Sequence, residues 1–300
     1  MNTGGGEVMF WKTLFKSHKD YGEEIAKARI WLEQADAIVI RIGSGFTPTV
    51  GVKEHFRDYF RMGYRKVSEL EEMYSLVTRE NMKAYWGFWA RYIKIVGYDN
   101  DAFNGYRDLV RLVSHKNYFV YTYNVDALPL KAGFDKEKVY EANGDCRFLQ
   151  CSNVCTKQLF ESEPWLEGMI QSMKGSLEID GRKVPRCPNC GGVLIPYINL
   201  ESSGKHLFEV LDTMPNEINY RNFLEAHKQQ NIVYLELGME NKIDDNDLVL
   251  GKRIQIHTKA HIPTKANHDS NEIIFMQGEI EEILAELADG IRILYTIDEF

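Results

Sequence analysis

The 300-residue sequence predicts an α/β fold, a doubly wound parallel sheet with a smaller domain formed by two insertions. Short apolar runs alternate with segments of helical period, which is typical of βαβ units. Four cysteines in two closely spaced pairs lie in a long stretch that interrupts this alternation. A composition of 44% hydrophobic and 27% charged residues is ordinary for a globular chain of this length.

Five apolar runs predict buried parallel strands, at Ala37–Ile42, 118–123, Ile232–Leu237, 253–258 and 272–276. Helical spacing of apolar residues lies between or after these runs, in Tyr106, Leu109, Val110 and Val113 and again in Ile280, Ile283, Leu284 and Leu287. A further helix is expected over residues 21–34. Right-handed crossovers then give a Rossmann-like sheet, and ligands of such sheets bind beyond the carboxyl ends of the strands.

Two long stretches, 50–101 and 141–212, interrupt the strands and helices. The first contains an aromatic helix over 82–96, which we interpret as core packing rather than a stacking platform. We expect a small domain, helical and cysteine-containing, over 51–101 and 141–212. The remaining ranges form the Rossmann-like domain (20–50, 102–140 and 213–300) and an N-terminal extension (1–19).

The cysteines predict a structural zinc site. Cys151 and Cys155 stand four apart, and Cys187 and Cys190 stand three apart in Arg-Cys-Pro-Asn-Cys-Gly-Gly, where proline and glycine let the backbone turn around an ion. Four cysteines close the tetrahedral shell, whereas a catalytic zinc keeps one position open. The alternative is two unrelated pairs of reduced core cysteines. Cys146 lies outside the pattern and is expected to be a buried thiol.

Charge and hydropathy restrict the partners. A net charge of −8 and a pI near 5.6 argue against nucleic acid. No apolar run of about 18 residues is present, so we expect no membrane span. The apolar residues at the N-terminus are too few, and too interrupted by Lys12 and Lys16, for a signal peptide. Together with an odd number of cysteines outside any disulfide framework, this predicts a cytoplasmic protein.

Two strand ends carry residues suited to a nucleotide. Gly43-Ser44-Gly45 resembles a phosphate-binding turn, although Pro48 occupies the position of the third glycine in the dinucleotide fingerprint. The alternative is a tight strand-to-helix turn. Asn124 and Asp126 stand two apart, so an extended backbone would project both to one side, where they could hold sugar hydroxyls. Equally, they could cap the following helix.

In their order, these segments resemble the sirtuins from about residue 20 to residue 290. The sirtuin loop corresponds to Gly43-Ser44-Gly45-Phe46-Thr47, and the sirtuin strand end corresponds to Thr122-Tyr123-Asn124-Val125-Asp126. The histidine-glycine pair corresponds to Asn143-Gly144, and the Gly-Thr-Ser turn corresponds to Gly238-Met239-Glu240. The four cysteines of the family correspond to the four cysteines described above. Segments shared with the macrodomain-linked class M sirtuins are Lys83-Ala84-Tyr85-Trp86, Lys131-Ala132-Gly133-Phe134-Asp135-Lys136, Gly144-Asp145 and Phe148-Leu149-Gln150-Cys151.

The resemblance implies NAD as co-substrate and protein ADP-ribosyl transfer as the reaction, with a lipoylated carrier related to the glycine-cleavage H protein as acceptor and a macrodomain protein as partner. By this likeness Gly43, Ser44, Gly45 and Thr47 line the NAD phosphates and ribose. Asn124 and Asp126 hold the nicotinamide ribose, and Gly238 lies near the adenosine half. Met239 and Glu240 are further cofactor-binding positions, although Met239 could simply pack.

The departures from the family bear on mechanism. Asn143 occupies the position of the histidine that serves as general base in deacylation, and an amide cannot take that proton. Residues 50–57 depart from the sirtuin cofactor loop, and Glu240 adds a negative charge near an expected anion. Deacylation is therefore disfavoured. Three functions stay open: an ADP-ribosyltransferase with Asn124, Asp126 and Asn143 at its centre, an NAD hydrolase, and a non-catalytic module that binds NAD or ADP-ribose.

Overall fold

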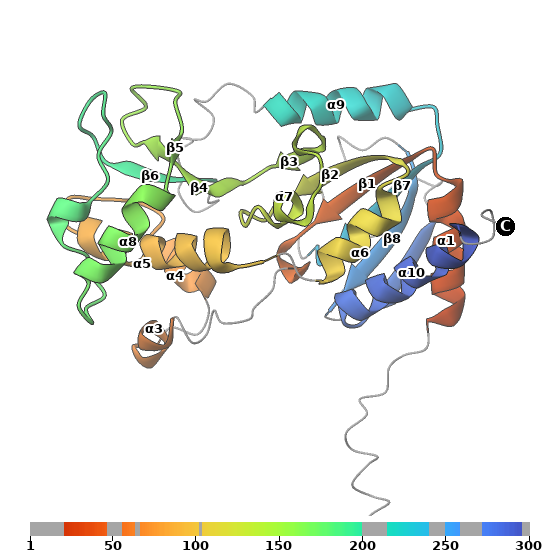
Figure 1. Cartoon of the computed structure of the whole chain (residues 1–300), viewed down its shortest axis with the longest axis horizontal. Coiled ribbons are helices and arrows are strands. Elements are labelled where there is room, and N and C mark those ends of the chain that lie inside the picture. The colour runs from red at the N-terminus through yellow and green to blue at the C-terminus, as the bar shows by residue number, and fades with distance from the viewer. Residues whose placement is uncertain are drawn as a thin grey trace, which may run out of the picture.

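The computed structural model describes residues 21–46, 56–63, 67–101, 104–199, 215–239, 250–258 and 272–295. In these ranges two lobes lie along the longest axis of the molecule (Figure 1). The larger lobe is built on a parallel sheet, and the smaller one combines helices with a three-stranded antiparallel sheet.

The large sheet has the strand order β3-β2-β1-β7-β8-β9 with every neighbouring pair parallel. Its strands are β1 (Ala37–Ile42), β2 (Asn117–Thr122), β3 (Val139–Glu141), β7 (Ile232–Leu237), β8 (Lys252–His257) and β9 (Ile273–Gln277). This confirms the predicted parallel sheet, with β2 and β8 one residue earlier than expected and β9 one residue later. The edge strand β3 was not predicted, because three residues are too few to show a pattern.

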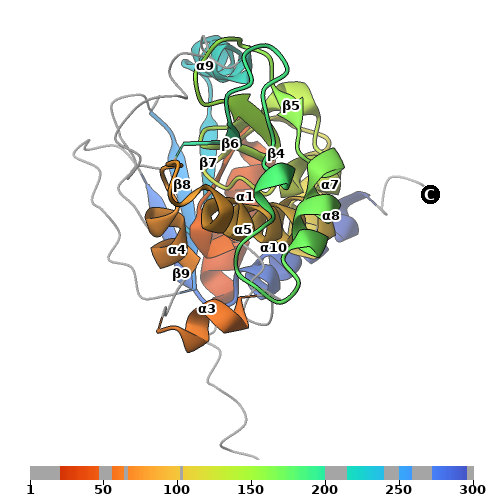
Figure 2. The same cartoon turned by 90° about the vertical axis from the view of Figure 1, so that its left-hand side faces the viewer.

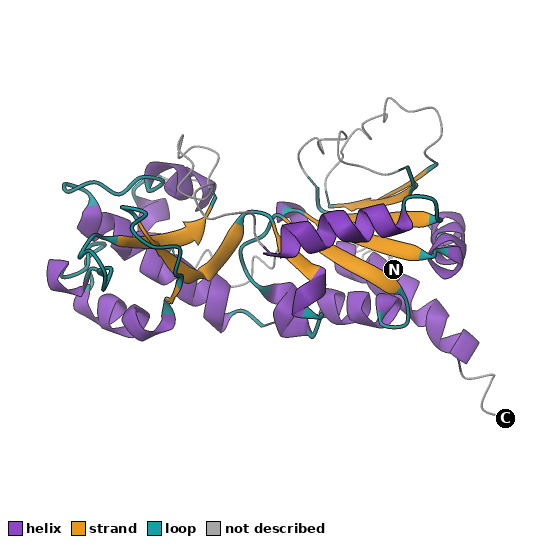
Figure 3. Ribbon diagram, turned by 90° about the horizontal axis from the view of Figure 1, so that it is seen from above, coloured by secondary structure: helices purple, strands orange, loops and turns teal. Residues whose placement is uncertain are grey.

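Helices cover both faces of this sheet. One face packs against α1 (Gly22–Gln34), α6 (Asn104–Val113) and α10 (Ile280–Tyr295), while α9 (Pro215–His227) lies on the other (Figures 1 and 3). Successive side chains of a strand alternate between faces, so Ile38 and Ile40 join the core under the first group whereas Val39 packs with Tyr220 and Leu224 of α9. The sheet is thus doubly wound.

The smaller lobe contains two groups of elements from distant parts of the chain (Figure 2). The first group is α3 (Arg57–Arg61), α4 (Val67–Met73), α5 (Met82–Tyr92) and the π-helix η3 (Ile93–Asp99). The second is β4 (Gly144–Cys151), β5 (Phe160–Glu161), α8 (Glu163–Ser172), the 3-10 helix η5 (Gly181–Lys183) and β6 (Leu194–Ile198). One hydrophobic cluster joins the two groups.

The aromatic residues of α5 form the centre of that cluster. Tyr85, Trp86, Phe88 and Trp89 are each at most 3% exposed, which confirms core packing. The helix predicted over 82–96 is α-helical only to Tyr92 and continues as η3. We propose that this cluster and the cluster beneath the large sheet are the cores of the two predicted domains.

Two further expectations concern single features. Cys146 is fully buried, as predicted. Among the helices that the structure describes, none combines the length and the apolar character that a membrane crossing requires.

Candidate functional site

The carboxyl ends of β1, β2 and β7 meet at one edge of the large sheet. Strand β1 lies between the other two, with Ile42 opposite Thr122 on one side and Leu237 on the other. The segments that follow these strands are therefore neighbours in space. They are residues 43–46, 123–127 and 238–239, which include most of the positions predicted to bind a nucleotide.

The turns after β1 and β7 interlock through their backbones. Gly45 N–H donates to the Gly238 carbonyl oxygen over 2.9 Å, and Gly43 N–H donates to that of Leu237 over 2.9 Å. Gly238 has φ +58°. A Cβ atom there would lie 2.4 Å from the backbone of Gly45 and Phe46, and one on Gly43 would lie 2.6 Å from the Gly238 oxygen. These glycines are required by the close approach of the two turns.

The predicted phosphate-binding turn is a short 3-10 helix, η2 (Ser44–Phe46). Ser44 is exposed at its start, and Phe46 is anchored in the core against the ring of Tyr106, 4.9 Å away. Ser44 thus gives the turn a polar, accessible surface, and Phe46 anchors its backbone. The alternative that we named, a tight strand-to-helix turn, describes the same geometry. Thr47 lies outside the described residues.

The segment after β7 is only partly described. Met239 is 6% exposed and packs against the protein. Its predicted contact with a cofactor stays a prediction. Glu240 lies outside the described residues, as do most of the divergent 50–57 loop and the histidines of residues 259–271.

Asn124 links the ends of β2 and β1. Its side chain is 8% exposed, and Nδ2 donates to the Gly43 carbonyl oxygen over 3.2 Å. Its backbone N–H donates to Oγ1 of Thr122 over 3.0 Å. The amide is consequently held in one orientation beside the 43–46 turn.

Asp126 has two oxygen atoms in different situations. Oδ1 accepts a hydrogen bond from the backbone N–H of Leu128 over 3.0 Å, at the start of the short helix α7 (Leu128–Ala132). The bond resembles the helix cap that we named as the alternative, but the N-cap residue of α7 is Ala127, and no side chain caps it. Oδ2 is buried and has no hydrogen-bond partner among the described residues. Burial raises the pKa of this 1% exposed carboxyl to about 6.

The geometric premise that we used for Asn124 and Asp126 was wrong. Strand β2 ends at Thr122, the backbone bends at Val125 and Asp126, and Ala127 adopts φ +55°. The two side chains are therefore not projected from one extended strand. They diverge, one toward the turn after β1 and the other toward α7.

Asn143 reaches the same region from the opposite side of β2. It follows β3, and its Nδ2 donates to the Tyr123 carbonyl oxygen over 2.9 Å. Tyr123 directly precedes Asn124, so the three predicted central residues are connected through the backbone after β2. Asn143 is partly exposed and carries no titratable group.

The sequence reading missed a set of charged residues beside these amides. Glu141 ends β3, Asp145 and Arg147 lie on β4, and Lys131 lies on α7. Arg147 makes a bidentate ion pair with Asp145, with Nη2 and Oδ2 2.6 Å apart. The sequence does contain two indications of this set. Glu141 and Asp145 lie two residues before and two residues after Asn143, and Lys131 belongs to one of the segments shared with the class M sirtuins.

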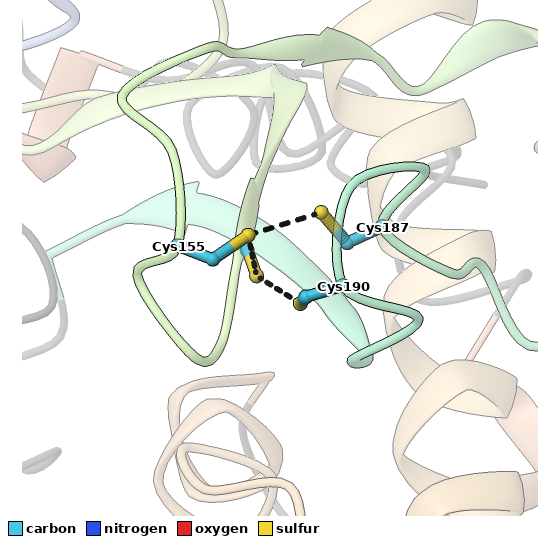
Figure 4. A group of neighbouring side chains, drawn as sticks. Cys155, Cys187 and Cys190 are labelled. Carbon is cyan, nitrogen blue, oxygen red and sulfur yellow. Dashed lines mark hydrogen bonds between the residues drawn. The ribbon is translucent and has the colours of Figure 1, made fainter.

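The four predicted metal ligands come together in the smaller lobe. All four sulfur atoms lie within 4.8 Å of one another, and Cys155 Sγ is 3.5 Å from the sulfurs of both Cys151 and Cys187. Figure 4 shows the side chains of Cys155, Cys187 and Cys190 converging from two loops. Zn–S bonds of about 2.3 Å in a tetrahedron place the sulfur atoms about 3.8 Å apart. The arrangement fits zinc.

The two loops of the site have features expected of a zinc knuckle. Gly191 has φ +72°, which a glycine adopts without strain. The backbone N–H of Gly192 lies 3.4 Å from Cys190 Sγ. This N–H lowers the pKa of Cys190 and so favours the thiolate that binds metal, whereas the contacts among the thiols raise the pKa of Cys155. Cys151 and Cys187 are buried in the cluster of the small lobe, as suits a structural ion.

The chain is similar to known proteins of one family. The model of the Sir2 family matches residues 43–224. A protein ADP-ribosyltransferase from Staphylococcus aureus (strain Mu50 / ATCC 700699) is 28% identical over 218 residues, which covers 70% of this chain and 67% of the relative. A probable bifunctional ADP-ribose hydrolase/ADP-ribosyltransferase from Fusarium oxysporum f. sp. cubense is 24% identical over 227 residues. That match covers 72% of this chain but only 37% of the relative's length.

Among solved structures, a complex of a Sir2 homologue with NAD superposes with a TM-score of 0.62 at 19% identity. The superposition covers 94% of this chain and 99% of the other. At this level of identity the similarity establishes the fold.

Proposed function

The chain belongs to the Sir2 family, and we propose from this that it transfers ADP-ribose from NAD to a protein acceptor and releases nicotinamide. Both curated relatives carry ADP-ribosyltransferase in their names. The structural observation that supports the proposal most is the convergence of three strand ends at which Asn124 is fixed and Asp126 presents an unpartnered buried oxygen. Strand ends of this kind are where Rossmann-like sheets bind nucleotides.

In the proposed complex, the turn formed by Gly43, Ser44 and Gly45, with Thr47, holds the phosphates. Asn124, Asp126 and Asn143 surround the nicotinamide ribose. The segment of Gly238, Met239 and Glu240 lies toward the adenosine half. The interlock between residues 43–45 and Gly238 supports this division, because it keeps the phosphate turn and the adenosine segment in a fixed relation.

The chemistry follows from the charge of the groups. As the bond from ribose C1′ to nicotinamide breaks, the nitrogen keeps the electron pair and positive charge develops on the ribose. A buried carboxylate is the group that stabilises this charge, and its effect is large where water is excluded. The acceptor then forms the new bond to C1′ and loses a proton. Fixed amides such as Asn124 contribute by positioning the ribose.

Deacylation is disfavoured by the residue that replaces the family's histidine. The Asn143 amide donates to a backbone carbonyl and cannot accept a proton from a ribose hydroxyl. Transfer to a protein places no such demand on this position, because the acceptor supplies its own nucleophile. The same departure leaves two alternatives, hydrolysis of NAD by water and binding of NAD without turnover.

The acceptor and the partner are finer parts of the proposal. The resemblance to the class M sirtuins suggests a lipoylated carrier protein as acceptor and a macrodomain protein as partner. The name of the Fusarium relative, which joins an ADP-ribose hydrolase to a transferase, is consistent with a partner that removes the modification.

The proposal is tested by measuring nicotinamide released from NAD in the presence of candidate carrier proteins. Asn124→Ala removes the hydrogen bond to Gly43 and is expected to lower the rate by about 10²-fold or more. Asn117→Ala is the matched control, because Asn117 lies at the opposite end of β2, where its Nδ2 donates to the Asp36 carbonyl oxygen. Equal rates in the wild type and Asn124→Ala would refute the site. No nicotinamide from any mixture would refute the function.

A further inference from the structure

The four cysteines of the zinc site are not equally accessible. Cys151 and Cys187 are each 2% exposed and pack in the hydrophobic cluster of the small lobe. Cys155 and Cys190 are exposed. These two come from different loops of the site, Cys155 from the loop after β4 and Cys190 from the knuckle before β6 (Figure 4). A reagent in solution can therefore reach one sulfur atom on each loop.

The two exposed sulfur atoms differ in their hydrogen bonds. Cys190 Sγ accepts from two N–H groups, the backbone N–H of Gly192 over 3.4 Å and Nδ2 of Asn153 over 3.6 Å. The contacts of Cys155 Sγ are with other sulfur atoms of the site, at 3.5 Å. No N–H group of the described residues donates to it. The metal-bound thiolate of Cys155 is thus the less stabilised of the two.

The two remaining sulfur atoms are protected by burial. Cys187 also accepts hydrogen bonds from the backbone N–H groups of Asn189 and Cys190 in its own turn. Cys151 is covered by the cluster of the small lobe. In the part of the chain that the structure describes, Cys155 is therefore the one zinc ligand that combines an exposed sulfur with the lack of an amide donor.

Both properties make a zinc-bound thiolate more reactive. An N–H group that points at the sulfur stabilises its negative charge and occupies a lone pair that would otherwise attack an electrophile. Each such bond is expected to slow the attack about threefold, and two bonds about tenfold. Exposure acts in the same direction, because the oxidation of a cysteine follows its thiolate character and its accessibility.

We propose that Cys155 is the reactive thiolate of the zinc site and that its oxidation by a peroxide releases the metal. The Cys155 sulfur attacks one oxygen of hydrogen peroxide, the O–O bond breaks, and a sulfenic acid and hydroxide form. The thiolate of Cys151 or Cys187, each 3.5 Å away, then attacks the sulfenic sulfur. This forms a disulfide and expels a second hydroxide. The two electrons lost by the sulfur atoms reduce the peroxide, and the two remaining thiolates hold the ion too weakly to retain it.

Release of the ion changes the small lobe, because two of the ligands belong to its core. Strand β4 ends at Cys151 and begins at Gly144, directly after Asn143 of the candidate site. One strand thus connects the zinc site with the ligand end of the large sheet. Oxidation is expected to lower the thermal stability of the small lobe, and a dithiol reductant with fresh zinc restores it. This inference does not depend on the proposed transfer reaction.

Labelling of the zinc-loaded wild type tests which sulfur reacts. The probe is a limiting amount of N-ethylmaleimide, and mass spectrometry of peptides locates it. Cys155 is expected to react about tenfold faster than Cys190. Cys146 is fully buried and lies outside the site, so its labelling serves as a control that reports unfolding. Equal rates at Cys155 and Cys190, or a faster reaction of Cys190, would overturn the proposal.

Histidine variants test the link to metal release. Cys155→His and Cys190→His each keep four ligands, since three cysteines and one histidine are a common structural zinc set. A chromogenic chelator follows the zinc released by hydrogen peroxide. Cys155→His should slow the release about tenfold, whereas Cys190→His should match the wild type. Equal slowing in both variants would overturn the proposal. If either variant binds less than a full complement of zinc, the labelling of the wild type decides.

A third variant tests the role of the hydrogen bonds. Asn153→Ala removes one N–H group from Cys190 and leaves all four ligands in place. The labelling of Cys190 should then become about threefold faster, while that of Cys155 stays constant. An unchanged rate at Cys190 would show that amide donors do not set the order of reactivity, and the proposed reason for the reactivity of Cys155 would fail.

Discussion

Replacing Gly238 by alanine is expected to destabilise the fold by about 2–5 kcal/mol. Two effects contribute. Gly238 has φ +58°, a conformation that costs a residue with a Cβ about 1–2 kcal/mol. The new Cβ would also lie 2.4 Å from the backbone of Gly45 and Phe46, and such overpacking costs about 1–3 kcal/mol. Because the opposing atoms are backbone, the 43–46 turn itself must move.

Substitutions of two other glycines measure the conformational cost and the steric cost separately. Gly133 has φ +100° and nothing within 4 Å of its Cβ position, so Gly133→Ala should cost only the conformational part, about 1–2 kcal/mol. Gly43 is outside the left-handed region, but its Cβ would lie 2.6 Å from the Gly238 oxygen. Gly43→Ala should therefore cost only the steric part, about 1–3 kcal/mol.

The assay is urea unfolding of the zinc-loaded proteins, with the free energies compared at a common slope. Gly238→Ala should exceed Gly133→Ala by an amount close to the cost of Gly43→Ala. If Gly238→Ala were no more destabilising than Gly133→Ala, the two turns would not be interlocked, and the fixed relation between the phosphate and adenosine segments would be refuted.

Two further predictions concern the metal and the buried acid. Cys187→Ser should lower the zinc content from about one ion per chain and unfold the small lobe, whereas Cys146→Ser should leave zinc bound. Metal analysis and thermal unfolding measure these two effects. Full zinc content in Cys187→Ser would contradict the four-cysteine site. Asp126→Asn retains an oxygen acceptor for the Leu128 N–H but cannot ionise. Since the folded pKa is raised to about 6, wild-type stability should fall by roughly 3 kcal/mol relative to this variant as pH rises from about 4 to above 6. A constant difference in unfolding free energy across that range would contradict it.

The sequence predicts the large sheet well because its strands are buried on both faces. Ala37–Ile42 and Ile232–Leu237 are buried along their whole length, and they read as apolar runs in which only Arg41 and Glu236 are charged. The edge strand Val139–Glu141 has no such run. The π-helix after Tyr92 was also missed, since the apolar pattern of an α-helix continues across its start.

The sequence predicts which residues could form the candidate site, but it does not predict how they lie. Asn124, Asp126 and Asn143 are neighbours, yet Asp126 turns toward α7 because the strand ends at Thr122. The contact between Gly43 and Gly238 depends on β1 and β7 being adjacent, which sequence order does not reveal. Glu141 was overlooked because its buried Oε1, which has no hydrogen-bond partner among the described residues, is visible only in the three-dimensional structure.

The most direct test of the account is the mass of a protein acceptor after incubation with this protein and NAD, measured beside the nicotinamide released. Lipoylated carrier proteins are the first acceptors to examine. If the protein is a transferase, the acceptor gains one ADP-ribose for each nicotinamide formed. Nicotinamide release with no change in the mass of any protein would contradict it and indicate hydrolysis by water.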